Sequence, residues 1–245
     1  MIRKIRIALQ QILRRNGIEL RKAPPQFRQM RVFDLAVQFL MASRGEKLSF
    51  VQIGANNGVD GDPLRAYILK CGWHGVLVEP QPDVFAELVT NYAEHKDRLK
   101  FENVAISTGD SLVLYRPPVD WPIGADGSTY VSAVPNVLAK QLGVSEKSLT
   151  RIEVPALTLD ALLFKHSITH LDLLQIDAEG FDWQVIRSID LSRLAPALIQ
   201  IETGHLSRAD LARVGEYLTD AGYELCYGGN GVDTVAILRE VIPSA

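Results

Sequence analysis

The chain has little of what would mark a disulfide-stabilised, membrane-spanning or repetitive protein. Its 245 residues include only two cysteines, Cys71 and Cys226, too few for a disulfide framework or a cysteine-rich metal site. No apolar run approaches the ~18 residues of a membrane-spanning helix, and neither an internal repeat nor a low-complexity tract is present. These absences predict a globular protein of a reducing compartment, and we expect it in the cytoplasm.

An excess of one charge is also lacking, because the net charge is only -3, but the charges are unevenly distributed. Residues 1–31 hold nine Lys or Arg and one acid, so they carry +8 and the remaining residues carry -11. An acidic body of this kind argues against a broad nucleic-acid-binding groove. We therefore expect no nucleic-acid partner.

The basic segment at the start has the pattern of an amphipathic helix. Apolar residues recur at helical spacing among the basic ones, at Ile2, Ile5, Leu9, Ile12 and Leu13. Charges interrupt the apolar stretch, which argues against a secretory signal. Three interpretations are open for residues 1–22: packing on the domain or on a second subunit, peripheral contact with an anionic membrane surface such as the inner one, or a poorly ordered arm.

From residue 48 onward, short apolar segments alternate with segments of helical pattern. The strand candidates are residues 49–53, 75–78, 99–106, 170–176, 197–201, 222–226 and 234–238. The helix candidates between them are residues 63–71, 82–92, 182–189 and 208–221. This alternation predicts an α/β fold with a parallel sheet covered on both faces, and the glycine-rich loop before the last strand predicts an antiparallel hairpin. A mostly parallel, Rossmann-like seven-stranded sheet with such a hairpin is typical of the class I methyltransferase fold.

Two regions fall outside this alternation. Residues 1–46 are expected to form a basic N-terminal helical extension, with a second helix over 33–42, and residues 47–245 are expected to form the main domain. Residues 107–158 break the pattern and contain several glycines. We expect an insertion there that acts as a lid over a binding site.

The most informative motif is FVQIGANNG at residues 50–58, followed by GVLVEP at residues 75–80. An apolar strand ends in a glycine loop, and a second strand ends in Glu79 about 20 positions later. Gly54 and Gly58 let the backbone approach a ligand closely because neither has a Cβ atom, and Asn56 and Asn57 are expected to contact the same ligand. Glu79 is placed to accept hydrogen bonds from ribose hydroxyls.

The G-x-G-x-x-G pattern of dinucleotide-binding folds is absent, and no basic residue stands beside the glycine loop. This disfavours a nicotinamide-dependent oxidoreductase and fits a nucleoside ligand without phosphates, such as S-adenosylmethionine. The N-P-P-[YFW] signature of many nucleic-acid amino-methylating enzymes is absent after the fourth strand as well. The alternative for the glycine motif is a tight strand-to-helix turn that happens to precede an acid.

Polar or small residues follow three further predicted strands. These are Asn103 and Ala105 at the third strand, Asp177 and Glu179 after the fourth, and Glu202 and His205 after the fifth. Ligands of doubly wound sheets bind beyond the carboxyl ends of the strands, so we expect these residues to converge on one crevice. A turn role for Asn103 and a helix-capping role for Asp177 are the alternatives.

Together these segments resemble the FkbM family of S-adenosylmethionine-dependent methyltransferases. The resemblance rests on FVQIGANNG, GVLVEPQPDVFAEL, NVAIS, VPALTLDALL and LDLLQIDAEGFDWQVI with LIQIE after it, which span residues 50 to about 202. It implies O-methylation of a sugar or of another hydroxyl on a natural product or glycan. It also implies that Gly54, Asn57 and Glu79 contact the cofactor and that Asp177 faces its methionine part and the substrate.

A hydroxyl acceptor reacts faster when a base removes its proton, and Asp177, Glu202 and His205 are the candidate catalytic residues for this role. Asp177, Glu179 and Glu202 offer the oxygen ligands that a magnesium-type ion prefers. Their spacing shows no dedicated ligand cluster, so we do not expect a metal to be required. The alternative hypothesis is a non-catalytic module that docks a membrane or protein partner through residues 1–22.

Overall fold

A computed structural model describes residues 31–121, 130–227 and 233–242 of the chain. The amphipathic helix predicted in residues 1–22, with its predicted membrane or subunit contacts, lies outside these residues. None of the described helices is both long and apolar enough to cross a lipid bilayer.

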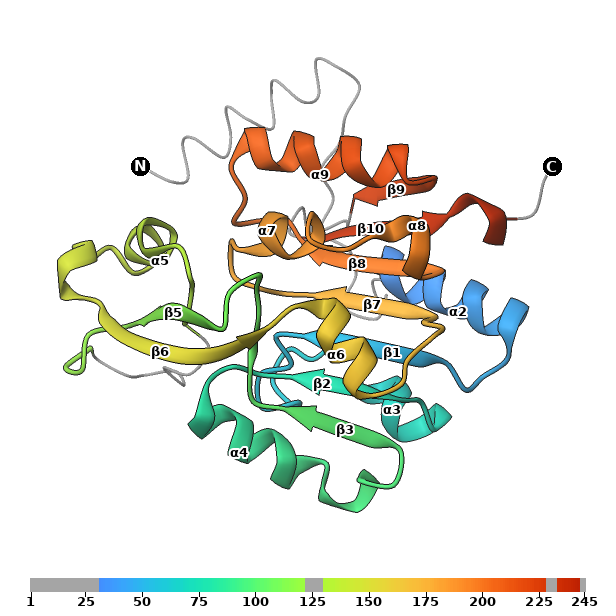
Figure 1. The fold of residues 1–245 in the computed structure, drawn as a ribbon, viewed down its shortest axis with the longest axis horizontal. Coiled ribbons are helices and arrows are strands. Elements are labelled where there is room, and N and C mark those ends of the chain that lie inside the picture. The colour runs from blue at the N-terminus through green and yellow to red at the C-terminus, as the bar shows by residue number, and fades with distance from the viewer. Residues whose placement is uncertain (1–30, 122–129, 228–232, 243–245) are drawn as a thin grey trace, which may run out of the picture. The chain divides into compact units, whose positions relative to one another are not determined.

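The centre of the fold is a seven-stranded sheet (Figure 1). Its strands are β1 (Ser49–Ile53), β2 (His74–Val78), β3 (Leu99–Glu102), β7 (Leu173–Ile176), β8 (Leu198–Glu202), β9 (Tyr223–Tyr227) and β10 (Asp233–Leu238). They follow the order β3-β2-β1-β7-β8-β10-β9, with parallel pairing from β3 to β8 and antiparallel pairing of β10 with both its neighbours. The predicted class I methyltransferase fold with an antiparallel C-terminal hairpin is therefore confirmed.

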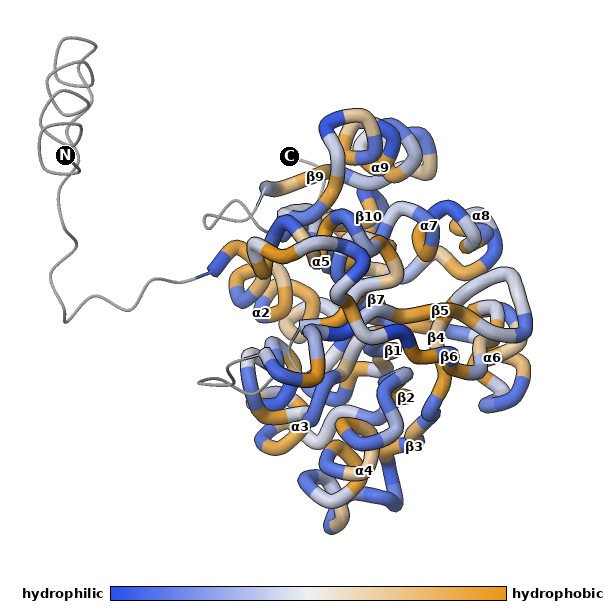
Figure 2. Tube along the Cα trace, turned by 90° about the vertical axis from the view of Figure 1, so that its left-hand side faces the viewer, coloured by the Kyte–Doolittle hydropathy of each residue, from blue (hydrophilic) through white to orange (hydrophobic). Residues whose placement is uncertain are grey.

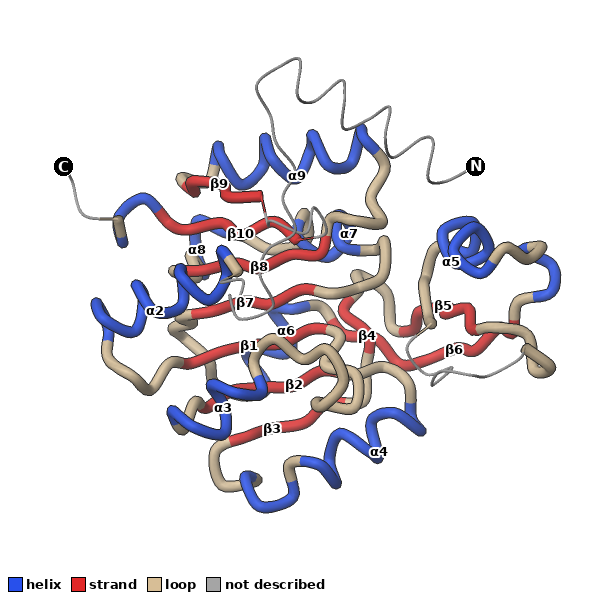
Figure 3. Tube along the Cα trace, turned by 180° about the vertical axis from the view of Figure 1, so that it is seen from behind, coloured by secondary structure: helices blue, strands red, loops and turns tan. Residues whose placement is uncertain are grey.

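Helices cover both faces of this sheet. One face packs against α6 (Leu159–Lys165), α7 (Asp182–Ile186), α8 (Leu191–Leu194) and α9 (Arg208–Asp220). The other face packs against α2 (Val32–Arg44), α3 (Arg65–Cys71) and α4 (Pro82–Asn91). Figures 1 and 3, which view opposite sides, show α6 in front of the sheet in one and α2 and α3 in front in the other.

Successive residues of a central strand serve the two cores in turn, because side chains alternate between the faces of a sheet. In β1, Val51 and Ile53 pack toward α6–α9, whereas Phe50 packs toward α2–α4. Strands buried on both faces are nearly continuous apolar runs. The helices around the sheet have only one buried side, and Figure 2 shows α2, α4 and α9 with both orange and blue parts.

A row of buried glutamines interrupts this apolar pattern. Gln52, Gln175 and Gln200 are partners in register across β1, β7 and β8, and all are at most 5% exposed. The side-chain Oε1 of each is buried and has no hydrogen-bond partner among the described residues. The sheet face toward α2–α4 is therefore polar near the carboxyl ends of these strands, next to the acids that follow them.

The predicted insertion over residues 107–158 builds most of a second sheet. The strands β4 (Ala105–Ile106), β5 (Ser111–Arg116) and β6 (Thr150–Leu157) pair in the order β4-β6-β5, and α5 (Pro135–Leu142) accompanies them. Figure 1 shows β5, β6 and α5 beyond the carboxyl ends of the parallel strands. The insertion is thus placed against the edge where a ligand is expected, and its movement as a lid stays a prediction.

One predicted strand is in fact two. The sequence predicts a single strand over residues 99–106, but the chain leaves the main sheet after Glu102 and enters the second sheet at Ala105. Asn103 makes the break, because its Nδ2 donates hydrogen bonds to the backbone oxygens of Glu79 and Pro80, at 2.9 and 3.1 Å. The chain therefore turns at residues 103–104, inside the predicted strand, and passes from the main sheet to the second sheet.

Two helices differ from the expected boundaries. α6 was not predicted, although Thr158 is a good N-cap and its Oγ1 accepts the N–H of Ala161. α2 confirms the helix predicted over residues 33–42, but it buries Phe33, Val37 and Leu40 in the core beside α3 and α4. The compact unit that contains α2 spans residues 31–245, and the division into an N-terminal extension and a main domain stays a prediction.

The glycine that ends β1 is required by packing between strands. Gly54 has φ +78°, and a Cβ atom there would lie 1.9 Å from the backbone oxygen of Asp177. The N–H of Asp177 donates to the backbone oxygen of Ile53 at 3.0 Å, which keeps the ends of β1 and β7 in contact. The absence of a side chain at Gly54 thus sets how closely the two strand ends approach.

We expect Gly54→Ala to lower the free energy of unfolding by about 3 kcal/mol or more, because the methyl group meets fixed backbone and the φ value is unfavourable. Gly72→Ala is the matched control: Gly72 has φ +69° but nothing within 4 Å of an added Cβ, so the loss should be about 1–2 kcal/mol. Chemical denaturation measures both values. Equal losses in the two variants would contradict the packing role of Gly54.

Candidate active site

A pocket opens where the carboxyl ends of β1, β2 and β7 meet the second sheet, and we call it the strand-end pocket. Its empty volume is about 710 Å³, which includes space that is open to solvent. Its polar lining residues are Asn56, Glu79, Gln81, Ser132, Asp177 and Glu179, beside Gly54. Its apolar lining residues include Val104, Ala105, Ile106, Leu112, Leu114, Val131 and Phe181.

The β1 loop and the end of β2 position one carboxylate in this pocket. Glu79 is 3% exposed. Its Oε2 accepts the N–H of Asn56 at 3.0 Å, and its Oε1 accepts the N–H of Gln81 at 2.9 Å. A carboxylate oxygen has a second lone pair, so Glu79 is fixed by the backbone and still able to accept hydrogen bonds from a ligand.

Three of the predicted ligand contacts do not line the pocket. Asn57 is buried in the loop, where its Oδ1 accepts two backbone N–H groups of the following turn. Gly58 packs on α4, where a Cβ would lie 2.4 Å from the Tyr92 ring. Asn103 binds the backbone at Glu79, as described above. These residues shape the loops around the pocket, whereas the other five predicted contacts, Gly54, Asn56, Glu79, Ala105 and Asp177, line it.

The loop after β7 presents two more carboxylates, those of Asp177 and Glu179. Glu179 has φ +49°, and Asn56 on the opposite loop has φ +48°; such left-handed backbone is unfavourable without glycine and clusters at functional sites. Ser132 Oγ donates to the backbone oxygen of Glu179 at 2.6 Å, and the fully buried Asp182 accepts two backbone N–H groups of the same loop. The strained loop is therefore held from two sides.

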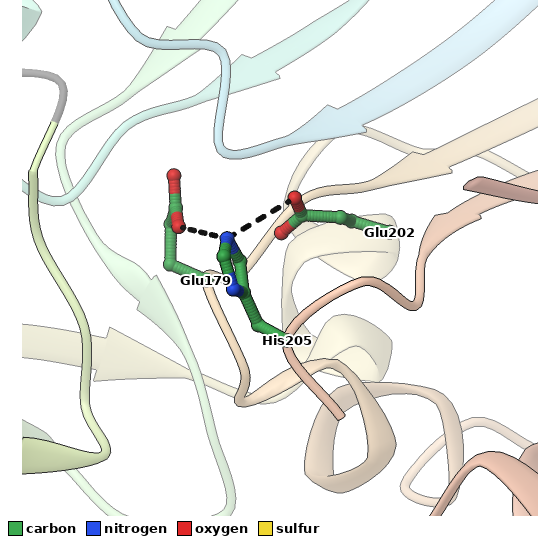
Figure 4. A group of neighbouring side chains, drawn as sticks. All are labelled: Glu179, Glu202 and His205. Atoms are coloured by element: carbon green, nitrogen blue, oxygen red, sulfur yellow. Dashed lines mark ion pairs between the residues drawn. The ribbon is translucent and has the colours of Figure 1, made fainter. Parts of the chain in front are cut away.

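Glu202 and His205 lie beside Glu179 but outside the pocket lining (Figure 4). His205 Nε2 is 3.5 Å from Glu179 Oε2 and 3.6 Å from Glu202 Oε1. One ligand atom from each of the three residues lies within 4.8 Å of the others. The structure thus brings His205 and Glu202 together with Glu179, while Asp177, which was expected among the possible metal ligands, is not a member of this close group.

Burial raises the pKa of two carboxyl groups that the backbone holds in place. The pKa of Glu79 rises to about 7 because the group is desolvated, although the two backbone N–H groups act in the opposite direction. The pKa of Asp182 rises to about 7 through burial and through the nearby charge of Asp177. Both groups exchange a proton near neutral pH rather than near pH 4.

The remaining acids repel one another as well. Burial, followed by the charge of Asp177, raises the pKa of Glu179 to about 8 and also raises the pKa of Glu202. Burial and the charge of Asp233 raise the pKa of Asp177 to about 6. Burial lowers the pKa of His205, which favours the neutral imidazole. The carboxyl groups at this edge therefore ionise less readily than solvated ones, and a positively charged ligand beside them would favour their ionised forms.

The charge of the pocket excludes some ligands. Within the described parts of the chain, its lining includes three carboxylates and no Lys, Arg or His. A phosphate-bearing ligand would meet repulsion from these carboxylates, and the nearby Arg116, whose charge acts on Glu79, is bound to Gln81 and Asp83. The pocket can hold a ligand that combines a positive charge, hydroxyl groups and an apolar ring.

Comparison with known families settles the assignment. The sequence profile described as "Methyltransferase FkbM domain" matches residues 52–225. The chain belongs to the FkbM methyltransferase family. The predicted resemblance is confirmed, and the family implies S-adenosylmethionine as the methyl donor. Curated protein sequences gave no match.

Solved methyltransferase structures also resemble this FkbM protein. The crystal structure of methyltransferase FkbM from Methylobacillus flagellatus KT is 11% identical, with a TM-score of 0.49 over 81% of this chain and 47% of that one. A precorrin-6y C5,15-methyltransferase from Geobacter metallireducens GS-15 is 15% identical, with a TM-score of 0.42 over 89% and 93%. The N-terminal domain of human METTL16 is 14% identical, with a TM-score of 0.47 over 93% and 77%. The chain thus spans about half the length of the Methylobacillus protein.

The strand-end pocket of this FkbM protein fits S-adenosylmethionine. Glu79 retains acceptor capacity for ribose hydroxyls, and Val104, Ile106 and Leu112 offer an apolar wall to a purine. The carboxylates of Asp177 and Glu179 suit the positive charges of the sulfonium and the amino group. The residues present therefore match the group in hydrogen bonding, polarity and sign of charge.

Several residues of the FkbM site were not predicted. Ser132 and the apolar lining residues Leu112, Leu114 and Val131 come from the insertion, whose pairing with the main domain no local pattern reveals. Asp182 was read only as the start of a helix, although an Asp five residues after Asp177 in IDAEGFD is a signal for a loop closed by its own side chain.

We predict that the unliganded protein becomes less stable as the pH rises from about 5 to about 7. Glu79 and Asp182 have folded-state pKa values of about 7, above the 4.5 and 3.8 of their solvated forms. The folded chain thus keeps protons that the unfolded chain has released in this window, and each group removes up to about 1.4 kcal/mol per pH unit.

Denaturant titrations at several pH values measure this slope. Glu79→Gln should reduce it, and Glu87→Gln, at an exposed position of α4, should leave it unchanged. Stability that rises with pH in this window would contradict the raised pKa values.

Proposed function

We propose that this FkbM protein transfers a methyl group from S-adenosylmethionine to a hydroxyl of a saccharide, glycan or natural-product acceptor. The observation that carries the proposal is the lining of the strand-end pocket, which combines three carboxylates, no basic side chain among the described residues and an apolar wall. The preference for a hydroxyl acceptor rests on the family resemblance.

The residues of the pocket would bind and orient the donor. Glu79 is held by the N–H groups of Asn56 and Gln81, so it accepts ribose hydrogen bonds without having to reorganise. Bound S-adenosylmethionine supplies an electrophilic methyl group on a positively charged sulfur. Because the reaction needs an acceptor oxygen held in line with that methyl group, rigid placement of both partners accounts for much of the rate.

Of the three predicted catalytic residues, Asp177 is best placed to take the acceptor proton. It lines the pocket, whereas Glu202 and His205 do not. A general base has to reach the proton it removes within hydrogen-bond distance or through one water. We therefore assign proton acceptance to the Asp177 carboxylate and assign no proton transfer to the other two.

The second sheet would limit the access of water to the reacting atoms. Leu112 and Leu114 of β5, together with Val131, give this side of the pocket an apolar surface. Ser132 ties the same segment to the loop after β7 through Glu179. Acceptor selection then depends on the insertion, since its side chains complete the wall opposite the main sheet.

We predict that Glu79→Ala weakens S-adenosylmethionine binding about 10–100-fold, because hydrogen bonds to a charged group contribute about 1.5–3 kcal/mol. Calorimetric titration with S-adenosylmethionine and S-adenosylhomocysteine measures the effect, with Glu87→Ala as the control and NADH as the ligand expected not to bind. Unchanged affinity in Glu79→Ala would show that the donor lies elsewhere, and no adenosyl binding by the wild type would refute the proposed activity.

We predict that Asp177→Asn lowers the methyl-transfer rate by about 10²–10⁴-fold, the usual contribution of a general base, while donor binding changes less. The rate is the formation of S-adenosylhomocysteine with a panel of monosaccharides, nucleotide sugars and hydroxylated ring compounds. Asp220→Asn, at an exposed position of α9, serves as control. Full activity of Asp177→Asn on the best acceptor would remove Asp177 from the proton-transfer step.

A further inference from the structure

Three side chains from three successive segments meet beside the strand-end pocket. Glu179 comes from the loop after β7, Glu202 is the last residue of β8, and His205 follows in the next loop. Figure 4 shows both carboxylates directed at the same ring nitrogen, His205 Nε2. The separations of 3.5 and 3.6 Å are longer than good hydrogen bonds.

We propose that Glu179, Glu202 and His205 bind one divalent transition-metal ion of the Mn²⁺, Co²⁺ or Zn²⁺ class. Ligand atoms about 2.1 Å from such an ion lie roughly 3.0–3.4 Å from one another. The distances from His205 Nε2 to the two carboxylates are close to this range. All three ligand atoms lie within 4.8 Å of one another, so small side-chain movements would bring them to coordination distance. The spacing thus fits shared coordination better than direct hydrogen bonding.

Unsatisfied acceptors give an independent indication that a cation is needed. Glu202 Oε2 is buried and has no hydrogen-bond donor among the described residues. Gln200 lies two residues earlier on β8 and is 5% exposed, and its Oε1 is likewise buried and without a hydrogen-bond partner among the described residues. Gln200, Glu202 and Arg31 line one small cavity, but the ion pair that Glu202 forms is with His205. Oxygen atoms that are desolvated and unpaired are costly, and a cation beside Glu202 relieves that cost.

The charges around the cluster point the same way. Among the described residues, neither Glu179 nor Glu202 forms an ion pair with a lysine or arginine, and the ion pair that each forms is with His205. Glu202 also shares a side-chain hydrogen bond with Asp177. The side chains of Glu179 and Glu202 are 24% and 12% exposed, so water screens them poorly. A dication would neutralise both carboxylates and accept the lone pair of a neutral imidazole.

The donor set decides which ion is favoured. Imidazole together with carboxylates suits first-row transition metals, whereas Mg²⁺ and Ca²⁺ prefer oxygen ligands alone. The all-carboxylate set expected from the sequence, Asp177 with Glu179 and Glu202, would have favoured Mg²⁺. The observed group contains His205 and not Asp177, and an imidazole ligand makes Mg²⁺ a less favoured ion.

The position of the site suggests what the ion would do, and this step rests on the proposed function. Three protein ligands leave coordination positions open for water or a substrate oxygen, as in catalytic metal sites. Glu179 also lines the strand-end pocket, and its strained backbone is fixed by Ser132. An ion held by Glu179 would therefore present its open positions toward the acceptor and hold an acceptor oxygen in place.

Metal binding by the full-length, EDTA-treated protein tests the proposal without any acceptor. We expect Co²⁺ to bind one per chain with visible d–d absorption, Mn²⁺ to bind at the same site by competition, and Mg²⁺ to compete poorly. His205→Gln, Glu202→Gln and Glu179→Gln should each weaken Co²⁺ binding roughly 10–100-fold or more. His166→Gln is the matched control, because His166 Nε2 contacts Glu102 Oε1 at 2.8 Å in a similar pair away from this site.

A wild type that binds Co²⁺ no better than His205→Gln, or an equal loss in His166→Gln, would overturn the proposal. Circular dichroism checks that each variant is folded. Should the variants not fold, anomalous diffraction from Mn²⁺-soaked wild-type crystals decides, with a peak among the three side chains expected and none there contradicting the site. Donor titration separates the two proposals: adenosyl binding without Co²⁺ binding refutes only the metal site, and the reverse refutes only the methyl-transfer function.

Discussion

Repulsion among partly buried carboxylates at one edge of the sheet is the constraint on which the rest of the site depends. The register places Glu202 opposite Asp233, and Asp177 and Glu202 follow the paired residues Ile176 and Ile201. Three acids therefore stand side by side on neighbouring strands, with Glu79 at the end of a fourth strand. Like charges directly across a sheet are destabilising. Among the described residues, Arg31 is the one basic side chain that lines the small cavity shared by these three acids, and its charge acts on Asp233.

That constraint connects the fold to the proposed chemistry. A parallel sheet collects the ends of its strands at one edge, and the apolar cores on both faces leave those ends poorly solvated. The pKa values of the carboxyl groups rise for this reason, and the same condition favours a positively charged donor in the pocket and a cation beside it. Stability of the unliganded chain and affinity for ligands therefore oppose each other at this edge.

The sequence was a good guide to those pocket residues that come directly after a strand. Glu79 and Asp177 each come directly after an apolar strand, and both line the pocket as expected. The sequence was a poorer guide to the role of glycines: Gly54 is required by the Asp177 backbone and Gly58 by the Tyr92 ring. Contacts between segments far apart in the chain, such as Ser132 with Glu179, leave no local pattern, and so the insertion wall and the Glu179–Glu202–His205 group became visible only in three dimensions.

The way the second sheet is attached has a consequence for how this protein could diversify. β4 pairs with β6 through two residue pairs, Ala105 with Ala156 and Ile106 with Leu157. We call these two short paired segments the stems. The insertion between them therefore begins and ends at the same place on the main domain. The stretch from β5 to β6 is therefore a cassette whose length and sequence can change while the seven-stranded sheet stays the same. Because Asn103 lies before the cassette and anchors the first stem to the backbone at Glu79, exchange of the cassette would leave this contact in place while it changes the wall of the pocket.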